Sequence, residues 1–346
     1  MIRAVLHRLF GGLKKARPLR PVRSVIETAE GIVLGTRELT AGAPHLRDHI
    51  EIKRYMSTVI LAMIPSTIAG IVFFGWWAVW MILTSYLVGG IIEVAFALIR
   101  KRDIEEGFLV TGLIFPLILP PTAPLWIVAV GIAFGTLFGK EVFGGTGRNI
   151  FNPALVGRVF VTIAFPKAMA ATWRAPFSDA ITAATPLSIY RGTAELTPYV
   201  DLLLGQVPGC LGELFRLGII VGGLFLIATR VASWRTSLVY LATVALFAAV
   251  GNALAPQSFA PPLFQLLAGG LLFGAFYMAT DPVSSPATKG GKVIFGVGAG
   301  ILTVLIRSFS GFTEGVMFSI LIMNAFSPLI DHLMINRRYP AAAPRG

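Results

Sequence analysis

A succession of long apolar segments constrains this chain more than any other feature, because a membrane span needs about 20 predominantly apolar residues. The 346-residue sequence contains ten candidate segments, several of them short or interrupted by Gly and Pro. They cover residues 57–75, 78–98, 108–120, 124–139, 153–166, 214–231, 236–254, 263–279, 293–308 and 315–331. The pattern predicts an all-α polytopic membrane protein with about ten transmembrane helices.

Charge supports the same class of protein. Only 13% of the residues are charged, against about 25% in soluble domains. The net charge of +12 would suggest a nucleic-acid partner in a soluble protein. Here the basic residues lie at the ends of the apolar segments, which indicates orientation in a lipid bilayer and no nucleic-acid partner. The single cysteine, Cys210, excludes a disulfide framework within the chain.

The basic residues fall on alternate sides of the predicted spans. Lys and Arg precede the first span and occupy the loops after the second, fourth, sixth, eighth and tenth, as in "RKRDIEEG" and "TRVASWR". The intervening loops, such as "PPTAP" and "APQSFAPP", are nearly uncharged. Basic loops stay in the cytoplasm, so both termini are predicted to be cytoplasmic.

The spans divide the chain into five predicted parts. They are a basic N-terminal tail with an amphipathic helix (1–56), a first five-helix repeat (57–166), an external loop (167–213), a second five-helix repeat (214–332) and a C-terminal tail (333–346). Because each repeat holds an odd number of spans, the second would enter the membrane from the opposite side, which gives two inverted five-helix repeats.

Two pairs of short sequences support this repeat. "GLIFPLILPPTAP" (Gly112–Pro124) aligns without gaps with "GLLFGAFYMATDP" (Gly270–Pro282), with five identities in thirteen positions. Further along, "NIFNPAL" from Asn149 is similar to "NAFSPLI" from Asn324. The two pairs occur in the same order, as a duplicated arrangement requires.

Asparagines flank one predicted helix start. In "GRNIFNPAL", Asn149 and Asn152 precede Pro153, a residue suited to the first turn of a helix. A helix start offers backbone N–H groups to an anion or to the polar edge of a ring. The alternative is a tight cytoplasmic turn with an asparagine cap.

Three acidic residues lie inside or beside predicted spans. Glu93 falls within the second span, where a charge costs about 2.5–3.5 kcal/mol and needs a partner, a proton or a function. Asp281 borders the eighth span, and Asp331 lies at the end of the tenth. Both aspartates are also typical of a turn or a solvated helix end.

The stretch "SDAITAATPLSIY" (Ser178–Tyr190) is too polar for a span. On its residues alone it is a surface loop, with Pro186 starting a helix.

Several long motifs carry a resemblance to one family. "LRDHIEIKRYM", "EGFLVTGLIFPLILPPTAPLW", "KEVFGGTGRNIFNPALVGR", "TAATPL", "PGCLGE", "MATDPVSSPATKGGK" and "EGVMFSILIMNAFSPLIDH" follow in unbroken order from about Arg47 to His332. In them the chain resembles the NqrB family, the B-type membrane subunits of the Na⁺-translocating NADH:quinone oxidoreductase. The paralogous RnfD family, from the Rnf ferredoxin:NAD⁺ complex, is similar too. The first motif favours the quinone reductase, whereas "DAITAATPL" favours Rnf.

The resemblance implies a covalent flavin. In this family a flavin transferase attaches FMN through its phosphate to a threonine, in a pattern close to Asp-x-x-Ser/Thr-Gly-Ala-Thr. The pattern falls on Asp179, Thr182, Ala184 and Thr185, with Thr185 as the acceptor and Ala183 at the usual glycine. A threonine hydroxyl is a poor nucleophile, which is why a separate enzyme is needed.

The resemblance also implies an electron path in a bacterial inner membrane. Other subunits would deliver electrons to FMN, then to riboflavin in a pocket that includes Asn149 and Asn152, and finally to ubiquinone near Gly89, Gly90 and Glu93. Sodium export would be coupled to this transfer, with Glu93, Asp281 and Asp331 as candidates for the sodium path. An alternative from another class is a cofactor-free channel or transporter, since inverted repeats are also a transport plan.

Overall fold

The computed structural model describes residues 52–101, 107–170, 173–177, 184–312 and 314–338. Most of the predicted N-terminal tail, the motif residues Asp179 and Thr182, and most of the C-terminal tail lie outside the described residues.

Helices account for all the regular structure of the described residues, which contain no β-strand. Six helices are long and apolar enough to cross a membrane, namely α3 (Ile52–Phe74), α4 (Trp76–Arg100), α6 (Leu125–Gly139), α12 (Trp234–Leu254), α15 (Lys289–Phe309) and α16 (Val316–Arg338). Three shorter apolar helices are α5 (Gly107–Leu117), α7 (Pro153–Ala164) and α11 (Arg216–Ala228). The predicted all-α polytopic class is confirmed.

The remaining elements are short. The predicted segment 263–279 forms α13 (Pro262–Leu267), α14 (Leu271–Phe273) and the π-helical turn η3 (Gly274–Met278). The 3₁₀ turn η2 (Glu141–Phe143) follows α6, and the segment between α7 and α11 holds α8 (Pro166–Ala170), α9 (Pro186–Thr193) and α10 (Tyr199–Leu204). Every predicted apolar segment is therefore helical at least in part.

Prolines end α5 in the protein interior. The "LPPTAP" sequence that follows supplies few backbone N–H donors, so the helix cannot continue. Instead, Gly212 N donates to Leu117 O at 2.7 Å and Leu211 N donates to Leu119 O at 3.2 Å. Irregular backbone is tolerated at membrane depth only where protein or a cavity surrounds it, and Leu117, Leu119 and Leu211 are all buried.

A second interruption separates α13 from α14. Gly269 adopts a φ of +64°, a left-handed conformation that favours glycine. Two buried arginines satisfy the carbonyl groups exposed by this break. Arg216 Nε donates to Leu267 O at 2.5 Å, and Arg307 Nη2 donates to Ala268 O at 3.0 Å.

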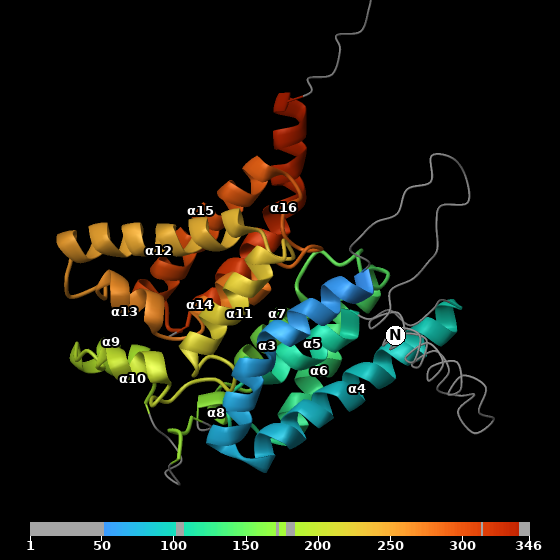
Figure 1. Cartoon of the computed structure of the whole chain (residues 1–346), viewed down its shortest axis with the longest axis horizontal. Coiled ribbons are helices and arrows are strands. Elements are labelled where there is room, and N and C mark those ends of the chain that lie inside the picture. Colours follow the sequence, from blue (N-terminus) through green and yellow to red (C-terminus); the bar gives the residue numbers. More distant parts are fainter. Residues whose placement is uncertain (1–51, 102–106, 171–172, 178–183, 313, 339–346) are drawn as a thin grey trace, which may run out of the picture.

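The two halves of the chain pack internally in the same way (Figure 1). In the first half α4 packs on α5 and α6, and α6 packs on α7. In the second half α12 packs on α13 and α15, and α15 packs on α16. The halves meet where α3 contacts α11 and where α7 contacts α16.

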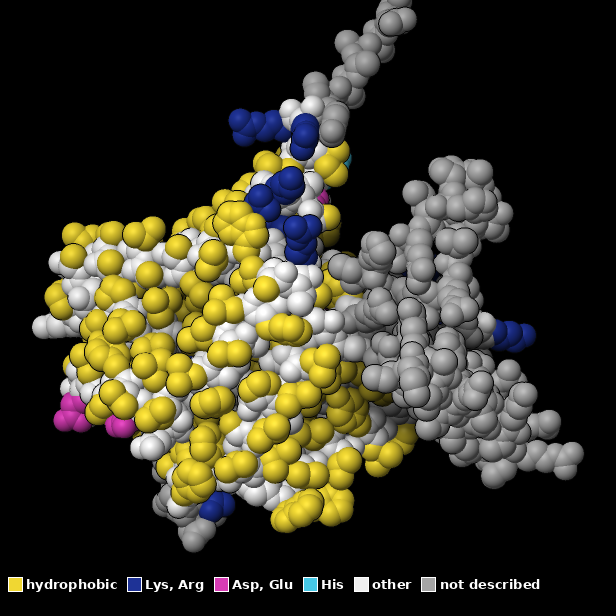
Figure 2. Space-filling view, viewed as in Figure 1, with side chains coloured by type: hydrophobic (Ala, Val, Ile, Leu, Met, Phe, Trp, Pro, Cys, Tyr) yellow, Lys and Arg dark blue, Asp and Glu magenta, His cyan; other side chains and the backbone are white. Residues whose placement is uncertain are grey.

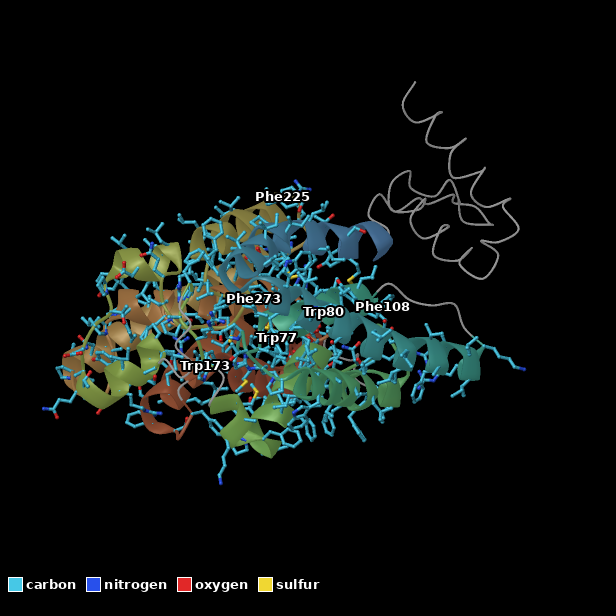
Figure 3. The ribbon with its side chains drawn as sticks, turned by 90° about the horizontal axis from the view of Figure 1, so that it is seen from below. Trp77, Trp80, Phe108, Trp173, Phe225 and Phe273 are labelled. Carbon is cyan, nitrogen blue, oxygen red and sulfur yellow. The ribbon has the colours of Figure 1, made fainter. Side chains whose placement is uncertain are left out.

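The outer surface is apolar, as a bilayer requires. Hydrophobic side chains cover most of the face in Figure 2, where most of the visible Lys and Arg side chains gather toward the C-terminal end of α16. Trp76, Trp77 and Trp80 are exposed near the start of α4, the last two labelled in Figure 3. Tryptophan is enriched at membrane–water interfaces, so this end of α4 fits a bilayer boundary.

Candidate functional site

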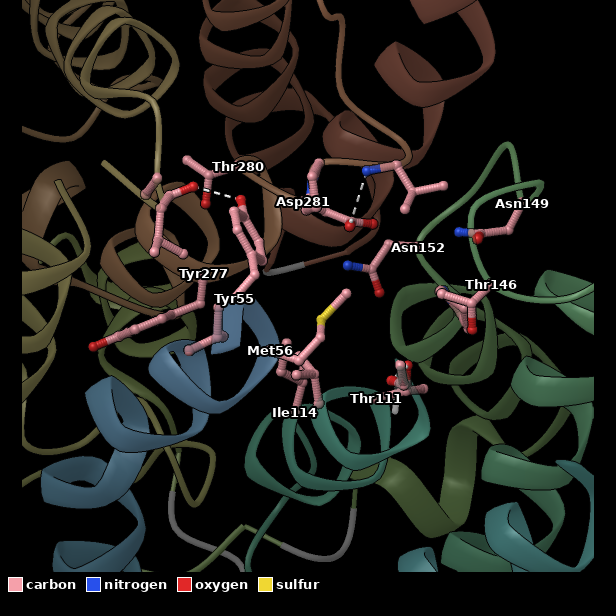
Figure 4. Close-up of a pocket in the computed structure, with 18 of the residues that line it drawn as sticks. Tyr55, Met56, Thr111, Ile114, Thr146, Asn149, Asn152, Tyr277, Thr280 and Asp281 are labelled. Carbon is pink, nitrogen blue, oxygen red and sulfur yellow. Dashed lines mark hydrogen bonds between the residues drawn. The ribbon is translucent and has the colours of Figure 1, made fainter. Parts of the chain in front are cut away.

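A cavity lies between the two halves of the chain (Figure 4). It encloses about 650 Å³, counted with the space at its open mouth. We call it the asparagine cavity. Its walls come from α3, α5, the loop before α7, the end of α11, and η3 with the turn after it, and include Tyr55, Thr111, Lys140, Asn149, Asn152, Tyr277 and Asp281.

Both predicted asparagines line this cavity. Asn152 caps α7, where its Oδ1 accepts from Ala154 N at 3.1 Å and Leu155 N at 3.4 Å. Asn149 Nδ2 donates to Phe151 O at 2.9 Å. Among the residues that the structure describes, Thr146 Oγ1 is buried at the cavity wall and has no hydrogen-bond partner. Such an unpaired buried hydroxyl is costly, so it marks a place for a polar group of a ligand.

The two predicted aspartates occupy different places. Asp281 lines the asparagine cavity, where it accepts from Ser284 Oγ at 2.7 Å and Val283 N at 3.3 Å. Burial raises the pKa of the Asp281 carboxyl, and the Ser284 hydrogen bond opposes that shift. Asp331 lies on α16 outside the cavity lining and accepts from Ala287 N at 2.7 Å and Thr288 N at 3.0 Å. Each aspartate therefore stabilises a turn.

Glu93 forms a buried ion pair. Its Oε1 lies 2.5 Å from Lys140 Nζ, and both side chains are almost fully buried. Because Lys140 lines the asparagine cavity, the pair borders that site. Of the other predicted quinone residues, Gly89 packs against Ile132 of α6 and Gly90 faces Phe108 of α5.

Thr185 is the N-cap of α9, and Pro186 is the first residue of that helix as predicted. Its Oγ1 accepts from Ser188 N at 3.4 Å and donates to Ser188 Oγ at 3.1 Å. Ala184 is exposed. Thr185 also lines a small cavity of about 340 Å³, the threonine cavity, with Arg158, Trp173, Leu187, Glu213 and Glu314.

A third cavity of about 370 Å³ shares part of its wall with the threonine cavity. We call it the central cavity. The two cavities share Arg158, Cys210, Glu213 and Glu314 on their walls. The central cavity also reaches Phe273, labelled in Figure 3, and Met278, which belong to the broken α14–η3 segment. Tyr277 of that same segment lines the asparagine cavity. The broken α14–η3 segment therefore contributes to the walls of both the central and the asparagine cavities.

Several buried charged residues in or near these walls were missed in the sequence. Arg158, Arg216 and Arg307 lie in apolar segments and are nearly fully buried, as Glu93 is. The criterion that selected Glu93, a charge within a span, would also have found these three arginines. Glu213 and Glu314 lie just outside spans, so that criterion does not reach them.

The candidate sodium residues are not brought together. Within the described ranges, no group of three or more His, Cys, Asp and Glu side chains is arranged to hold a metal ion. Glu93 pairs with Lys140, and the two aspartates bind different turns.

These helices and cavities define a polytopic helical membrane protein with polar sites buried between two bundles. Residues 39–340 match the family described as NQR2, RnfD, RnfE. The chain belongs to this family.

Relatives match over most of the chain. The B-type subunit of the Na(+)-translocating NADH-quinone reductase of Klebsiella pneumoniae (strain 342) is 35% identical over an alignment of 403 residues, which covers 97% of this chain and 96% of the relative. Its namesake from Ectopseudomonas mendocina (strain ymp) is 36% identical over 396 residues, 96% of each chain. That of Pseudomonas aeruginosa (strain LESB58) is 46% identical over 266 residues, 73% of this chain and 66% of the relative.

Proposed function

We propose that this chain is the B-type, flavin-carrying membrane subunit of a Na⁺-translocating NADH:quinone reductase. The names of its relatives support a place in such an oxidoreductase complex, with further subunits as partners. In this role it takes electrons from a partner flavoprotein, passes them through FMN and riboflavin to quinone, and works in a complex that exports sodium. The flavins supply the redox chemistry, while the protein binds and orients them.

The position of Thr185 carries the proposal. Its hydroxyl lies at the start of a helix and at the wall of a cavity. A phosphate ester there would meet the positive end of the helix dipole. Ser188 N already points at Thr185 Oγ1, and this contact needs the threonine oxygen only as an acceptor. Arg158 and Trp173 on the cavity wall offer a cation and an aromatic surface to the attached group.

Flavin attachment is tested by in-gel fluorescence of the denatured chain co-expressed with a flavin transferase. We expect Thr185→Ala to abolish the signal and Thr185→Ser to retain part of it. Thr193→Ala is the matched control, because Thr193 lies at the other end of α9 and donates to Ile189 O. Peptide mapping by mass spectrometry then locates the flavin.

Full fluorescence in Thr185→Ala would contradict this attachment site. A parent chain without flavin, after co-expression with the transferase, would instead favour a cofactor-free channel or transporter. Electron-transfer assays of the whole complex distinguish the two complexes. Electron transfer from NADH to quinone would indicate the quinone reductase, and transfer from reduced ferredoxin to NAD⁺ would indicate an Rnf-type complex.

Riboflavin fits the asparagine cavity. The isoalloxazine ring has a hydrogen-bonding edge, and the cavity offers the Asn149 and Asn152 amides together with the unpaired Thr146 hydroxyl. Its other walls include Met56 and Ile114, which suit the flat faces of the ring. In this proposal Gly89, Gly90 and Glu93 remain the candidates for the quinone region, and Glu93 borders the same cavity through Lys140.

The membrane arrangement completes the proposal. Ten crossings in two inverted repeats are supported by the matching helix contacts of the two halves. They place both termini in the cytoplasm of a bacterium and Thr185 on the outer side of its inner membrane. Glu93, Asp281 and Asp331 remain candidates for the sodium path, each as a single carboxylate ligand.

A further inference from the structure

Glu213 lies in an unusual position for a glutamate. It belongs to the non-helical segment before α11, and only 8% of its surface is exposed. Its Oε1 accepts one hydrogen bond, from Cys210 N at 2.7 Å. No donor among the described residues reaches Oε2. Because Glu213 lines both the central and the threonine cavities, this carboxyl is available to a ligand in either of them.

A second carboxyl group, that of Glu314, lies close by. Glu314 Oε2 accepts from Gly270 N at 3.0 Å, and a Cβ built on Gly270 would lie 2.8 Å from Glu213 Oε2. Glu314 is fully paired as a carboxylate, because its Oε1 accepts from Arg307 Nη2 at 2.9 Å and from Gly315 N at 3.2 Å. Its negative charge therefore opposes ionisation of Glu213.

The remaining groups around Glu213 do not form an ion pair with it. Arg158 of α7 donates to Cys210 Sγ at 3.2 Å, and Arg216 of α11 donates to Leu267 O at 2.5 Å. Both arginines favour the ionised glutamate at longer range. Burial, followed by the charge of Glu314, acts against them and raises the pKa of the Glu213 carboxyl.

We propose that Glu213 is a proton-carrying residue for the flavin attached at Thr185. This inference rests on the proposed function, because it takes the threonine cavity as the flavin site. A flavin bound there would supply the one-electron chemistry, with the electron coming from the flavoprotein partner. The Glu213 carboxylic acid would give its proton to the flavin as the electron arrives, becoming a carboxylate, and would take that proton back as the electron leaves. One proton would thus move with each electron, between Glu213 and the flavin.

The first test needs no flavin. In the chain expressed without transferase, infrared spectroscopy at neutral pH should show the C=O stretch of a protonated carboxylic acid that disappears in Glu213→Gln. The amide keeps the shape and the acceptor for Cys210 N, so the variant should fold. Glu195→Gln is the matched control, because Glu195 is exposed and should leave the band unchanged. A spectrum with no band lost in Glu213→Gln would overturn the proposal.

The second test uses the flavinylated chain. Reduction of the covalent flavin should bleach the Glu213 band, and reoxidation should restore it. A band that stays constant through the redox cycle would also overturn the proposal. A chain that never acquires covalent flavin would count against the proposed function. The first test would remain valid in that case, because a carboxylic-acid band that Glu213→Gln removes identifies Glu213 as protonated without any flavin.

Discussion

Single residues in this protein show how buried charge is accommodated. Glu93 and Lys140 lie 47 residues apart, and their contact of 2.5 Å joins the middle of α4 to the end of α6. Each charge would be costly alone at this depth, and their mutual attraction offsets much of that cost. The same pair borders the asparagine cavity, so it connects helix packing with the proposed quinone region.

Removal of one partner should therefore cost more than removal of both. We expect Glu93→Gln to lower the free energy of unfolding by about 3–5 kcal/mol, because Lys140 is left buried without its counter-charge. The double variant Glu93→Gln/Lys140→Gln should recover part of this loss, and thermal unfolding in detergent measures both. A double variant whose loss of free energy equals the sum of the losses in the two single variants would contradict the pairing.

Turnover of the Glu93→Gln variant answers a separate question. A higher sodium concentration for half-stimulation would place Glu93 on the sodium path, while a higher KM for quinone would place it at the quinone site. Asp281→Asn and Asp331→Asn serve as the parallel variants. Unchanged sodium stimulation in all three amide variants, with flavins retained, would move the ion path to a partner subunit.

Among the elements, α6 and α7 pack through glycine. Gly131, Gly135 and Gly139 recur every four residues and form one face of α6. A Cβ on Gly135 would lie only 2.4 Å from Pro153 O, at the start of α7. Small residues let helices approach closely in a membrane, where packing replaces the hydrophobic effect as the driving force.

A methyl group at this contact should separate the two helices. We expect Gly135→Ala to lower the free energy of unfolding by about 1–3 kcal/mol, because backbone on the neighbouring helix cannot move aside as a flexible side chain would. Gly192→Ala is the control, since no atom lies within 4 Å of the Cβ built at Gly192 and its φ is not positive. Thermal melting of the two variants side by side checks this. Equal melting temperatures would contradict the close packing.

The elements also show how far sequence reasoning reached. Hydrophobicity located the long apolar helices, because the length of an apolar segment can be counted in the sequence, but it did not locate α9 and α10 in the predicted external loop. It did not reveal that residues after Leu117 and before Arg216 pair with each other, since that contact joins segments about 90 residues apart. Leu117 and Glu213, from these two segments, both line the central cavity. The motifs thus predicted Asn149, Asn152 and Thr185 as site residues but not the charged walls around Thr185.

At the scale of the whole molecule, the short helices determine the topology. If only the six long helices crossed the membrane, Lys140, Arg148, Arg230 and Arg235 would lie on the side opposite the other basic loops. If α5, α7, α11 and the broken α13–η3 segment cross as well, the N-terminal tail and the basic loops after the second, fourth, sixth, eighth and tenth crossings share one side, as the positive-inside rule requires. Protein contacts satisfy the interrupted backbone of these elements, which makes such crossings physically acceptable.

Cysteine labelling distinguishes these two topologies at Ser258. Ser258 is exposed in the loop after α12, and ten crossings place it outside whereas six crossings place it inside. We expect Ser258→Cys in intact cells to react with a membrane-impermeant maleimide. Ala287→Cys, exposed before α15, should react only after the cells are opened, because both topologies place it inside. The native Cys210 is buried, so the parent chain should remain unlabelled. Protection of Ser258→Cys in intact cells, with labelling after lysis, would contradict ten crossings and the inverted repeat that depends on them.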